Sequence, residues 1–224
     1  MTDKLWSLLA DSFWKILLPG LTATIPLTVI SFAFALIIAT VTALIQFARV
    51  PVLRTIARFY IWIVRGTPLL VQLFVIFFGL PKIGVVLSPF PAAIIVFAIN
   101  TGAYDAETVR AALESVPRGQ LEAGECVGMT YWQTMRRIVL PQAMRTAFPS
   151  LSNSLIALVK DTSLAANITV AEMFMTTQRI VARTYEPLAL YIEVGLIYLI
   201  FSTFLTWLQG WGEKKLNVYE KREA

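Results

Sequence analysis

The sequence predicts an all-α integral membrane protein that forms one domain, 1–224, with five transmembrane helices. Of its 224 residues, 57% are hydrophobic and 15% are charged, and the mean hydropathy of +0.69 is higher than a soluble domain of this size usually carries. The apolar residues lie in runs of about 20, the length that a helix needs to cross about 30 Å of hydrocarbon. A single bundle of spanning helices therefore fits better than a soluble core.

Five segments have the length and apolar character of a membrane span. The first contains no charged residue, and the third becomes charged from Asp105 to Glu114, so we expect its last turns to stand in water. The fifth is apolar apart from Glu193 and a few hydroxyls, and Trp207 and Trp211 are expected to anchor it at the membrane interface. The segments are about 22–46, 56–80, 92–113, 151–170 and 188–211.

The second segment contains a strong helix breaker, formed by Gly66, Thr67 and Pro68. Proline removes a backbone donor and clashes with the preceding turn, so we expect the helix to kink near Pro68. Backbone groups freed by such a break are tolerated in a membrane only beside protein or a water-filled cavity.

Lys and Arg residues indicate the orientation, because positive residues in short flanking loops are retained in the cytoplasm. They are frequent after the first, third and fifth segments and sparse elsewhere, which places the N-terminus outside and the C-terminus in the cytoplasm. The frequent set is Arg49, Arg54, Arg58, Arg65, Arg118, Arg136, Arg137, Arg145, Lys214, Lys215, Lys221 and Arg222, and the sparse set is Lys4, Lys15, Lys82, Arg179 and Arg183.

Several function classes are disfavoured by composition. With one cysteine, Cys126, and no histidine, neither a disulfide framework nor the usual zinc sites are expected, and we predict no metal site. The net charge of +5 is carried at the ends of apolar runs rather than on a basic stripe, which disfavours nucleic acid. The chain has no phosphate-binding Gly-Lys-Ser/Thr loop and no visible catalytic set, so we expect no enzyme activity of its own.

The connection between the third and fourth segments, about 118–141, is the most informative part of the chain. It predicts a short helix over about 120–127, a stop at Gly128, and a second helix that ends at Pro141. Thr130, with Gln133 three residues later, matches a capping box at the start of that second helix. A helical pair that is too short to be a domain is suited to docking on a partner, although an ordinary structured loop would have the same pattern.

This connection resembles the cytoplasmic signature of the membrane subunits of binding-protein-dependent ABC importers. Glu122-Ala123, Gly128 and Leu140-Pro141 stand at the matching places. The resemblance implies a type I ABC importer permease fold in which the first short helix is the coupling helix, with Glu122, Ala123, Gly124 and Gly128 as its characteristic residues. Gly124 departs from the commoner Ala and should cost the helix about 0.5–1 kcal/mol.

Three further motifs narrow the resemblance to the polar amino-acid subfamily, and together they cover nearly the whole chain. Four motifs in the right order at fitting positions make coincidence improbable. The sequence as a whole most resembles the cystine-type permeases, and it resembles the arginine, histidine, glutamine and glutamate permeases almost as much. The motifs are Arg65-Gly66-Thr67-Pro68-Leu69-Leu70-Val71-Gln72, Ala103-Tyr104 with Ala106-Glu107 and Arg110, and Leu158-Val159-Lys160-Asp161-Thr162-Ser163-Leu164.

The resemblance also implies an assembly in the bacterial cytoplasmic membrane. Two separate ATPase subunits would use ATP and Mg, while this chain binds no cofactor. A second permease, identical or homologous, would complete the pathway, and an extracytoplasmic binding protein would deliver an amino acid. An ion-coupled secondary transporter that uses Asp161 or Glu193 is the alternative from another class, but it leaves the 118–141 connection unexplained.

Charged and amide groups inside the predicted spans are candidate substrate groups, because they are costly in lipid unless they face partners or a cavity. Lys160 and Asp161 are expected near the middle of the fourth segment. Asp161 would take the ammonium group of an amino acid, or else Lys160 and Asp161 only lock helices together. The predicted pathway set is Asp161, Lys160, Thr162, Ser163, Gln72, Asn100 and Tyr104.

Two other sets of charged residues are assigned differently. The spacing of Glu107, Arg110 and Glu114 predicts ion pairs on one helix face, which we interpret as structural. Glu193 is either at a helix interface or on the pathway, and the sequence alone does not decide between them.

Overall fold

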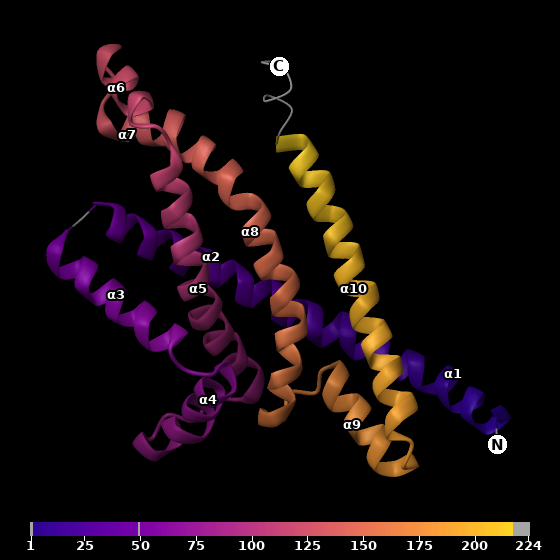
Figure 1. Cartoon of the computed structure of the whole chain (residues 1–224). Coiled ribbons are helices and arrows are strands. Elements are labelled where there is room, and N and C mark those ends of the chain that lie inside the picture. The colour runs from indigo at the N-terminus through magenta and orange to yellow at the C-terminus, as the bar shows by residue number, and fades with distance from the viewer. Residues whose placement is uncertain (1, 49, 217–224) are drawn as a thin grey trace.

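The computed structural model describes residues 2–48 and 50–216 of the chain, and every regular element within them is a helix. Figure 1 shows α6, α7 and the end of α10 at one end of the molecule, and α4 and α9 at the opposite end. Arg49, Lys221 and Arg222 of the charge pattern lie outside the described residues.

The first helix is much longer than predicted. α1 (Thr2–Pro19), the π-helical turn η1 (Gly20–Thr24) and α2 (Ile25–Ala48) form one continuous helix, whereas the sequence predicts a start near residue 22. The wider π turn directly after Pro19 keeps the helix going past the proline. At Gly20 an added Cβ would lie 2.6 Å from the Met173 sulfur, so the absence of a side chain allows close packing here.

The predicted break lies between α3 (Pro51–Arg65) and α4 (Leu69–Phe74), whose directions differ by 103°. Pro68 has extended backbone angles and stands at the N-cap of α4, so its missing N–H and its ring lie outside the interior of both helices. The chain then continues through the π-helical turn η2 (Val75–Gly79) and the 3₁₀ turn η3 (Leu80–Ile83).

α2 packs along α5 (Pro89–Ser115), and small residues make the approach close. Ala39, Ala103 and Ala106 are fully buried together in one apolar cluster. A Cβ at Gly102 would lie 2.9 Å from Ile38 Cγ2, so this position admits only glycine at the observed spacing. Small residues let membrane helices approach closely and gain van der Waals contacts. These contacts matter because lipid tails are as apolar as the side chains, so the hydrophobic effect contributes little to helix association in a membrane.

The fourth predicted segment differs from the structure at both ends. α7 (Tyr131–Thr134), the π-helical turn η4 (Met135–Val139) and α8 (Leu140–Asp161) follow one another without a break, so the prediction that Pro141 ends a helix is wrong. The π turn before Pro141 accommodates a residue that has no backbone N–H. α8 ends at Asp161 and a 3₁₀ helix, η5 (Thr162–Ile168), follows, which puts Lys160 and Asp161 at a helix end rather than in the middle.

A helix that the sequence analysis did not predict, α9 (Met173–Thr184), lies between η5 and α10 (Pro187–Leu216). It contacts α1 and α10. Two of its residues, Met173 and Thr177, are fully buried, so α9 is part of the packed bundle.

The number of spanning helices stays a prediction. Within the described residues, Lys4–Phe47 and Pro187–Leu216 are long and apolar enough to cross a membrane. Two bent pairs, Pro51–Arg65 with Leu69–Ile83 and Tyr131–Ile168 with Met173–Thr184, also pass when each pair is taken together. These give two to four candidate spans, and α5 is not among them.

Candidate functional site

The α6–α7 hook, which we define as residues 118–134, stands at one end of the molecule (Figure 1). α6 (Arg118–Cys126) ends where Gly128 takes a left-handed conformation, with φ of +74°. The Thr130 N–H donates to Gln133 Oε1 over 2.8 Å, and the Gln133 N–H donates to Thr130 Oγ1 over 3.4 Å. The predicted glycine stop and capping box are therefore both present.

The hook is held closed by a contact between Gly124 and Thr134. Gly124 is the only buried residue among Arg118–Cys126. A Cβ at this position would lie 2.5 Å from Thr134 Oγ1 and 2.7 Å from its Cγ2, closer than side chains approach one another. The departure from alanine at Gly124 therefore has a packing reason, because the two short helices cross at this residue.

The outer surface of the hook carries both acidic and large apolar side chains. Glu122 and Ala123 are exposed, as residues predicted to contact a partner have to be. Val127 is 75% exposed and Trp132 is 74% exposed, and Tyr131 beside them is also exposed. Large apolar side chains left in solvent beside charges are typical of a protein docking surface. The sequence analysis gave no role to Trp132 or Val127.

The hook is continuous with two helices of the bundle. α5 ends at Ser115, three residues before α6 begins, and α7 leads through η4 into α8. Leu121 of α6 packs against a cluster that contains Leu113 of α5 and Val139 of η4. α5 and α8 also pack on each other, so a displacement of the hook acts on both helices at once.

Gln72 bridges the helix break rather than lying free beside it. Its side-chain amide donates to the Val64 carbonyl at 2.8 Å, to the Thr67 carbonyl at 3.1 Å and to the Thr67 hydroxyl at 2.9 Å. These acceptors lie at the end of α3 and in the break, where backbone carbonyls lack helical partners. Gln72 therefore satisfies the polar groups that the break frees.

Asn100 and Tyr104 of α5 lie against the same region. Asn100 donates to Gln72 Oε1 over 3.1 Å, which joins α5 to the break. The guanidinium carbon of Arg65 lies 5.1 Å from the centre of the Tyr104 ring, a cation–π distance. These predicted pathway residues are brought together around the break.

The other predicted pathway residues form a second group. Lys160 and Asp161 are exposed, and neither joins a salt bridge within the part of the chain that the structure describes. Lys160 and Ser163 line a cavity of about 430 Å³ beside α9 and α10. Gln72 lines a different, apolar cavity of about 260 Å³ with Thr67. The predicted set thus divides between two places in this single chain.

The hydroxyls of Thr162 and Ser163 both donate to backbone carbonyls. Thr162 is fully buried and donates to the Val159 carbonyl over 2.6 Å. Ser163 donates to the Lys160 carbonyl over 2.7 Å. The Ser163 hydroxyl keeps its lone pairs for a further donor, such as an ammonium group, whereas the buried Thr162 hydroxyl does not face the cavity.

Three buried carboxylates lie within the helix bundle, and two of them connect helices. Glu193 accepts a hydrogen bond from the Ser12 hydroxyl over 2.5 Å, which places it at the interface of α10 and α1. Glu172, which the sequence analysis missed, is fully buried and accepts from the Met175 N–H at 2.7 Å. Glutamate is not a favoured N-cap residue, so no sequence signal marked it. Its second oxygen accepts from the Tyr198 hydroxyl at 2.9 Å and ties α9 to α10.

The third carboxylate corrects a prediction for the end of α5. Asp105 was expected to stand in water, but it is 2% exposed because it faces the packed bundle. The ion pairs predicted further along α5 are confirmed, since Arg110 contacts Glu107 at 2.8 Å and Glu114 at 2.7 Å.

Comparison with known proteins decides the family. The family model described as "Binding-protein-dependent transport system inner membrane component" matches residues 34–218. The chain belongs to this family. The resemblance on which the sequence analysis relied is confirmed, and the chain is a permease component of an ABC transporter.

Relatives cover almost the whole chain. The L-cystine transport system permease protein TcyB of Bacillus subtilis is 48% identical over 215 residues, which are 96% of this chain and 92% of the relative. The probable amino-acid ABC transporter permease protein PatM of Vibrio harveyi is 42% identical over 205 residues, which are 90% of this chain and 92% of PatM. Both relatives are permease proteins, and neither is described as an enzyme.

Solved structures confirm the fold class. A crystal structure of an amino acid ABC transporter with histidines superposes with a TM-score of 0.84 at 30% identity, covering 92% of this chain and 96% of that one. The MetNI methionine ABC transporter in an inward-facing conformation gives a TM-score of 0.77 at 19% identity over 92% of this chain and 98% of its own. At 19% identity, the second likeness shows the fold alone.

Proposed function

We propose that this chain is the transmembrane permease subunit of an ATP-driven importer for cystine or another polar amino acid. The single observation that carries the proposal is the exposed α6–α7 hook, which is fixed at its base to α5 and α8 and presents Glu122, Val127 and Trp132 outward. The 48% identity to an L-cystine permease supports cystine as the substrate.

In this proposal two separate ATPase subunits supply the energy, because no phosphate-binding loop is visible in the chain. They bind ATP and Mg, close on each other and carry α6 with them. Since α6 is continuous with α5 and indirectly with α8, the bundle rocks from inward-open to outward-open. A second permease, identical or homologous, completes the pathway.

The proposed orientation puts the hook and the end of α10 in the cytoplasm and the N-terminus outside. The position of both elements at one end of the molecule supports this orientation (Figure 1). An extracytoplasmic binding protein would then deliver its amino acid to the opposite end. The membrane is the bacterial cytoplasmic membrane, which agrees with the inner-membrane description of the family.

For the substrate we propose that Asp161 takes the ammonium group, with Ser163 as a neighbouring hydroxyl acceptor, while the buried Thr162 braces the start of η5. Asp161 is exposed and free of a salt bridge within the described chain, so its carboxylate is available to a positively charged ligand. Gln72 already bonds the helix break and Asn100 bonds Gln72, so both would shape the pathway rather than bind the substrate directly.

The test is uptake of labelled cystine into vesicles that contain the complete complex. We expect uptake to require ATP on the hook side, to stop when the ATPase subunits are inactivated, and to continue when ionophores collapse ion gradients. Uptake that persists without ATP hydrolysis but stops with ionophores would contradict the proposal and favour an ion-coupled transporter. Uptake of another amino acid but not cystine would overturn only the choice of substrate.

A further inference from the structure

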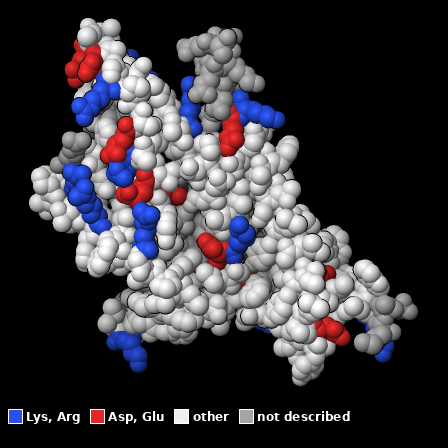
Figure 2. Space-filling model, viewed as in Figure 1, with Lys and Arg blue, Asp and Glu red and all other residues white. Residues whose placement is uncertain are grey.

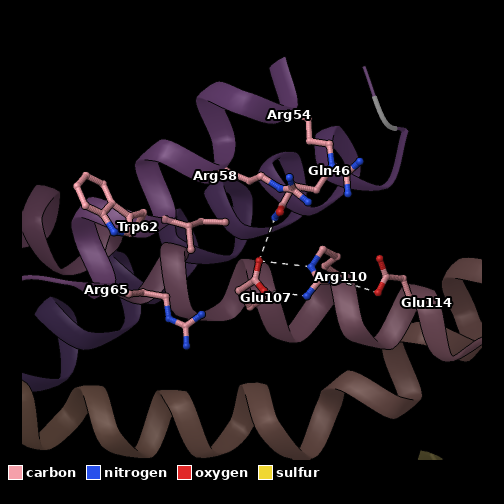
Figure 3. Close-up of a pocket in the computed structure, with 9 residues that line it drawn as sticks. Gln46, Arg54, Arg58, Trp62, Arg65, Glu107, Arg110 and Glu114 are labelled. Carbon is pink, nitrogen blue, oxygen red and sulfur yellow. Dashed lines mark hydrogen bonds and ion pairs between the residues drawn. The ribbon is translucent and has the colours of Figure 1, made fainter. Parts of the chain in front are cut away.

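A basic cavity of about 310 Å³ lies between α2, α3 and α5, outside the hook and the predicted pathway groups (Figure 3). Four arginines and two glutamates line it, so its formal charge is four minus two, or +2. The charged residues are Arg54, Arg58 and Arg65 of α3 with Glu107, Arg110 and Glu114 of α5.

The two glutamates of the cavity already have ion-pair partners within the chain. Glu107 and Glu114 both pair with Arg110, and Glu107 also accepts from the Gln46 amide over 3.2 Å. Arg65 lies over the Tyr104 ring. Within the residues that the structure describes, Arg54 and Arg58 join no salt bridge, although they line the same cavity.

The Arg54 guanidinium also lacks a hydrogen-bond acceptor for one buried donor among the residues that the structure describes. Its Nε is buried and has no hydrogen-bond partner within the described part of the chain. A buried donor without an acceptor is costly, and a charged one more so. Such a group beside a cavity of net positive charge indicates an anionic ligand that accepts hydrogen bonds.

The opposite side of α3 is apolar and faces outward. Val52, Ile56, Phe59 and Ile63 recur at helical spacing and are all exposed, and Trp62, which lines the cavity, is 71% exposed. Figure 2 shows basic side chains gathered on the face formed by α3 and α5. A helix that is basic on one side and apolar on the other, with an exposed tryptophan at the edge of the basic side, is typical of the boundary between lipid tails and headgroups.

We propose that this cavity binds the phosphodiester headgroup of an acidic phospholipid such as phosphatidylglycerol. Arg54 and Arg58 hold the phosphate oxygens, and the acyl chains leave the cavity past Trp62, which lines it and is exposed. Basic pockets between membrane helices bind anionic headgroups by this chemistry. The exposed Trp62 in the cavity lining, together with the outward apolar side of α3, favours a lipid over a free anion. The inference needs only the membrane location of the family and is independent of the transported substrate.

Lipid retention by the complete complex tests the inference. The complex with its ATPase subunits is purified in detergent and mixed with phosphatidylglycerol or phosphatidylcholine of the same acyl chains, and bound lipid is counted by native mass spectrometry. We expect phosphatidylglycerol to be retained in preference. Arg54→Gln and Arg58→Gln should each weaken that retention about fivefold, and the double variant about 25-fold, if each arginine acts independently. Arg58→Lys, which keeps the charge, should retain most of it.

Lys82→Gln is the matched control, because Lys82 is an exposed cation in η3, outside the cavity, and its loss should leave retention unchanged. Unchanged elution of the assembled complex shows that each variant is folded. Equal retention of the two lipids, or full retention by the double arginine variant, would overturn the inference. Displacement of phosphatidylglycerol by equimolar inorganic phosphate would show a site for free anions, and displacement by the transported amino acid would show a substrate site. Either result would also overturn it.

Discussion

The contact between Gly124 and Thr134 gives the sharpest test of the hook. In Gly124→Ala, the new methyl group would lie 2.5 Å from Thr134 Oγ1, so α6 has to move away from α7. Alanine favours a helix over glycine by about 0.5–1 kcal/mol, whereas overpacking costs about 1–3 kcal/mol. The net destabilisation of the closed hook is therefore about 1 kcal/mol.

This cost should appear as weaker docking of the ATPase subunit. If docking requires the closed hook, about 1 kcal/mol corresponds to about fivefold lower affinity. The assay is titration of the purified permease with its ATPase subunit, with binding followed by fluorescence. Gly119→Ala is the matched control, because a Cβ at Gly119 meets nothing within 4 Å and the substitution lies on the same helix. Its affinity should equal or exceed that of the wild type.

The second half of the test is rescue. Thr134→Ala removes both clashing atoms, and it removes a buried hydroxyl that has no hydrogen-bond partner within the described residues. Gly124→Ala combined with Thr134→Ala should therefore bind about as well as Thr134→Ala alone. The packing argument fails if Gly124→Ala binds like the wild type, or if the double variant shows the sum of the two single effects.

Three further predictions follow from the site. Trp132→Ala should weaken ATPase binding by about 2 kcal/mol, as loss of an interface anchor does. The control Trp6→Ala, which removes an exposed tryptophan of α1, should leave binding unchanged. Equal effects of the two substitutions would show that the hook is not the docking surface. Gln72→Ala should lower the free energy of unfolding by about 1–3 kcal/mol, because it leaves the carbonyls of the break without a donor. Thermal denaturation of the complex measures this change. The control Gln178→Ala, at an exposed residue of α9, should leave the free energy of unfolding unchanged. Asp161→Asn should raise the KM for uptake about tenfold or more, because it removes a charge-assisted hydrogen bond; an unchanged KM would assign Asp161 another role.

The features that sequence reasoning predicted well are local. The capping box at Thr130 and Gln133, the stop at Gly128 and the break at Pro68 each depend on the backbone chemistry of a few adjacent residues. The ion pairs of Arg110 follow from helical spacing alone.

The features that it missed depend on packing between distant segments. Pro141 can either end a helix or follow a π turn within a continuous helix. Which of the two occurs depends on how the neighbouring helices pack against this segment. Glu172 is recognisable only from its bond to Tyr198, 26 residues later, and the choice between the two roles left open for Glu193 depends on its bond to Ser12, 181 residues earlier. The placement of Gln72 in one cavity and of Lys160 and Ser163 in another is likewise a property of the tertiary fold.

Cys126 offers the most direct measurement of the coupling mechanism. It is the only cysteine in the chain, it is exposed, and it lies in α6. The rate at which a maleimide labels Cys126 can therefore be measured in the isolated permease and in the complex with its ATPase subunit. If α6 docks on the ATPase, labelling should be strongly slowed in the complex and should change again when ATP is added. Equal labelling rates with and without the ATPase subunit would contradict the account.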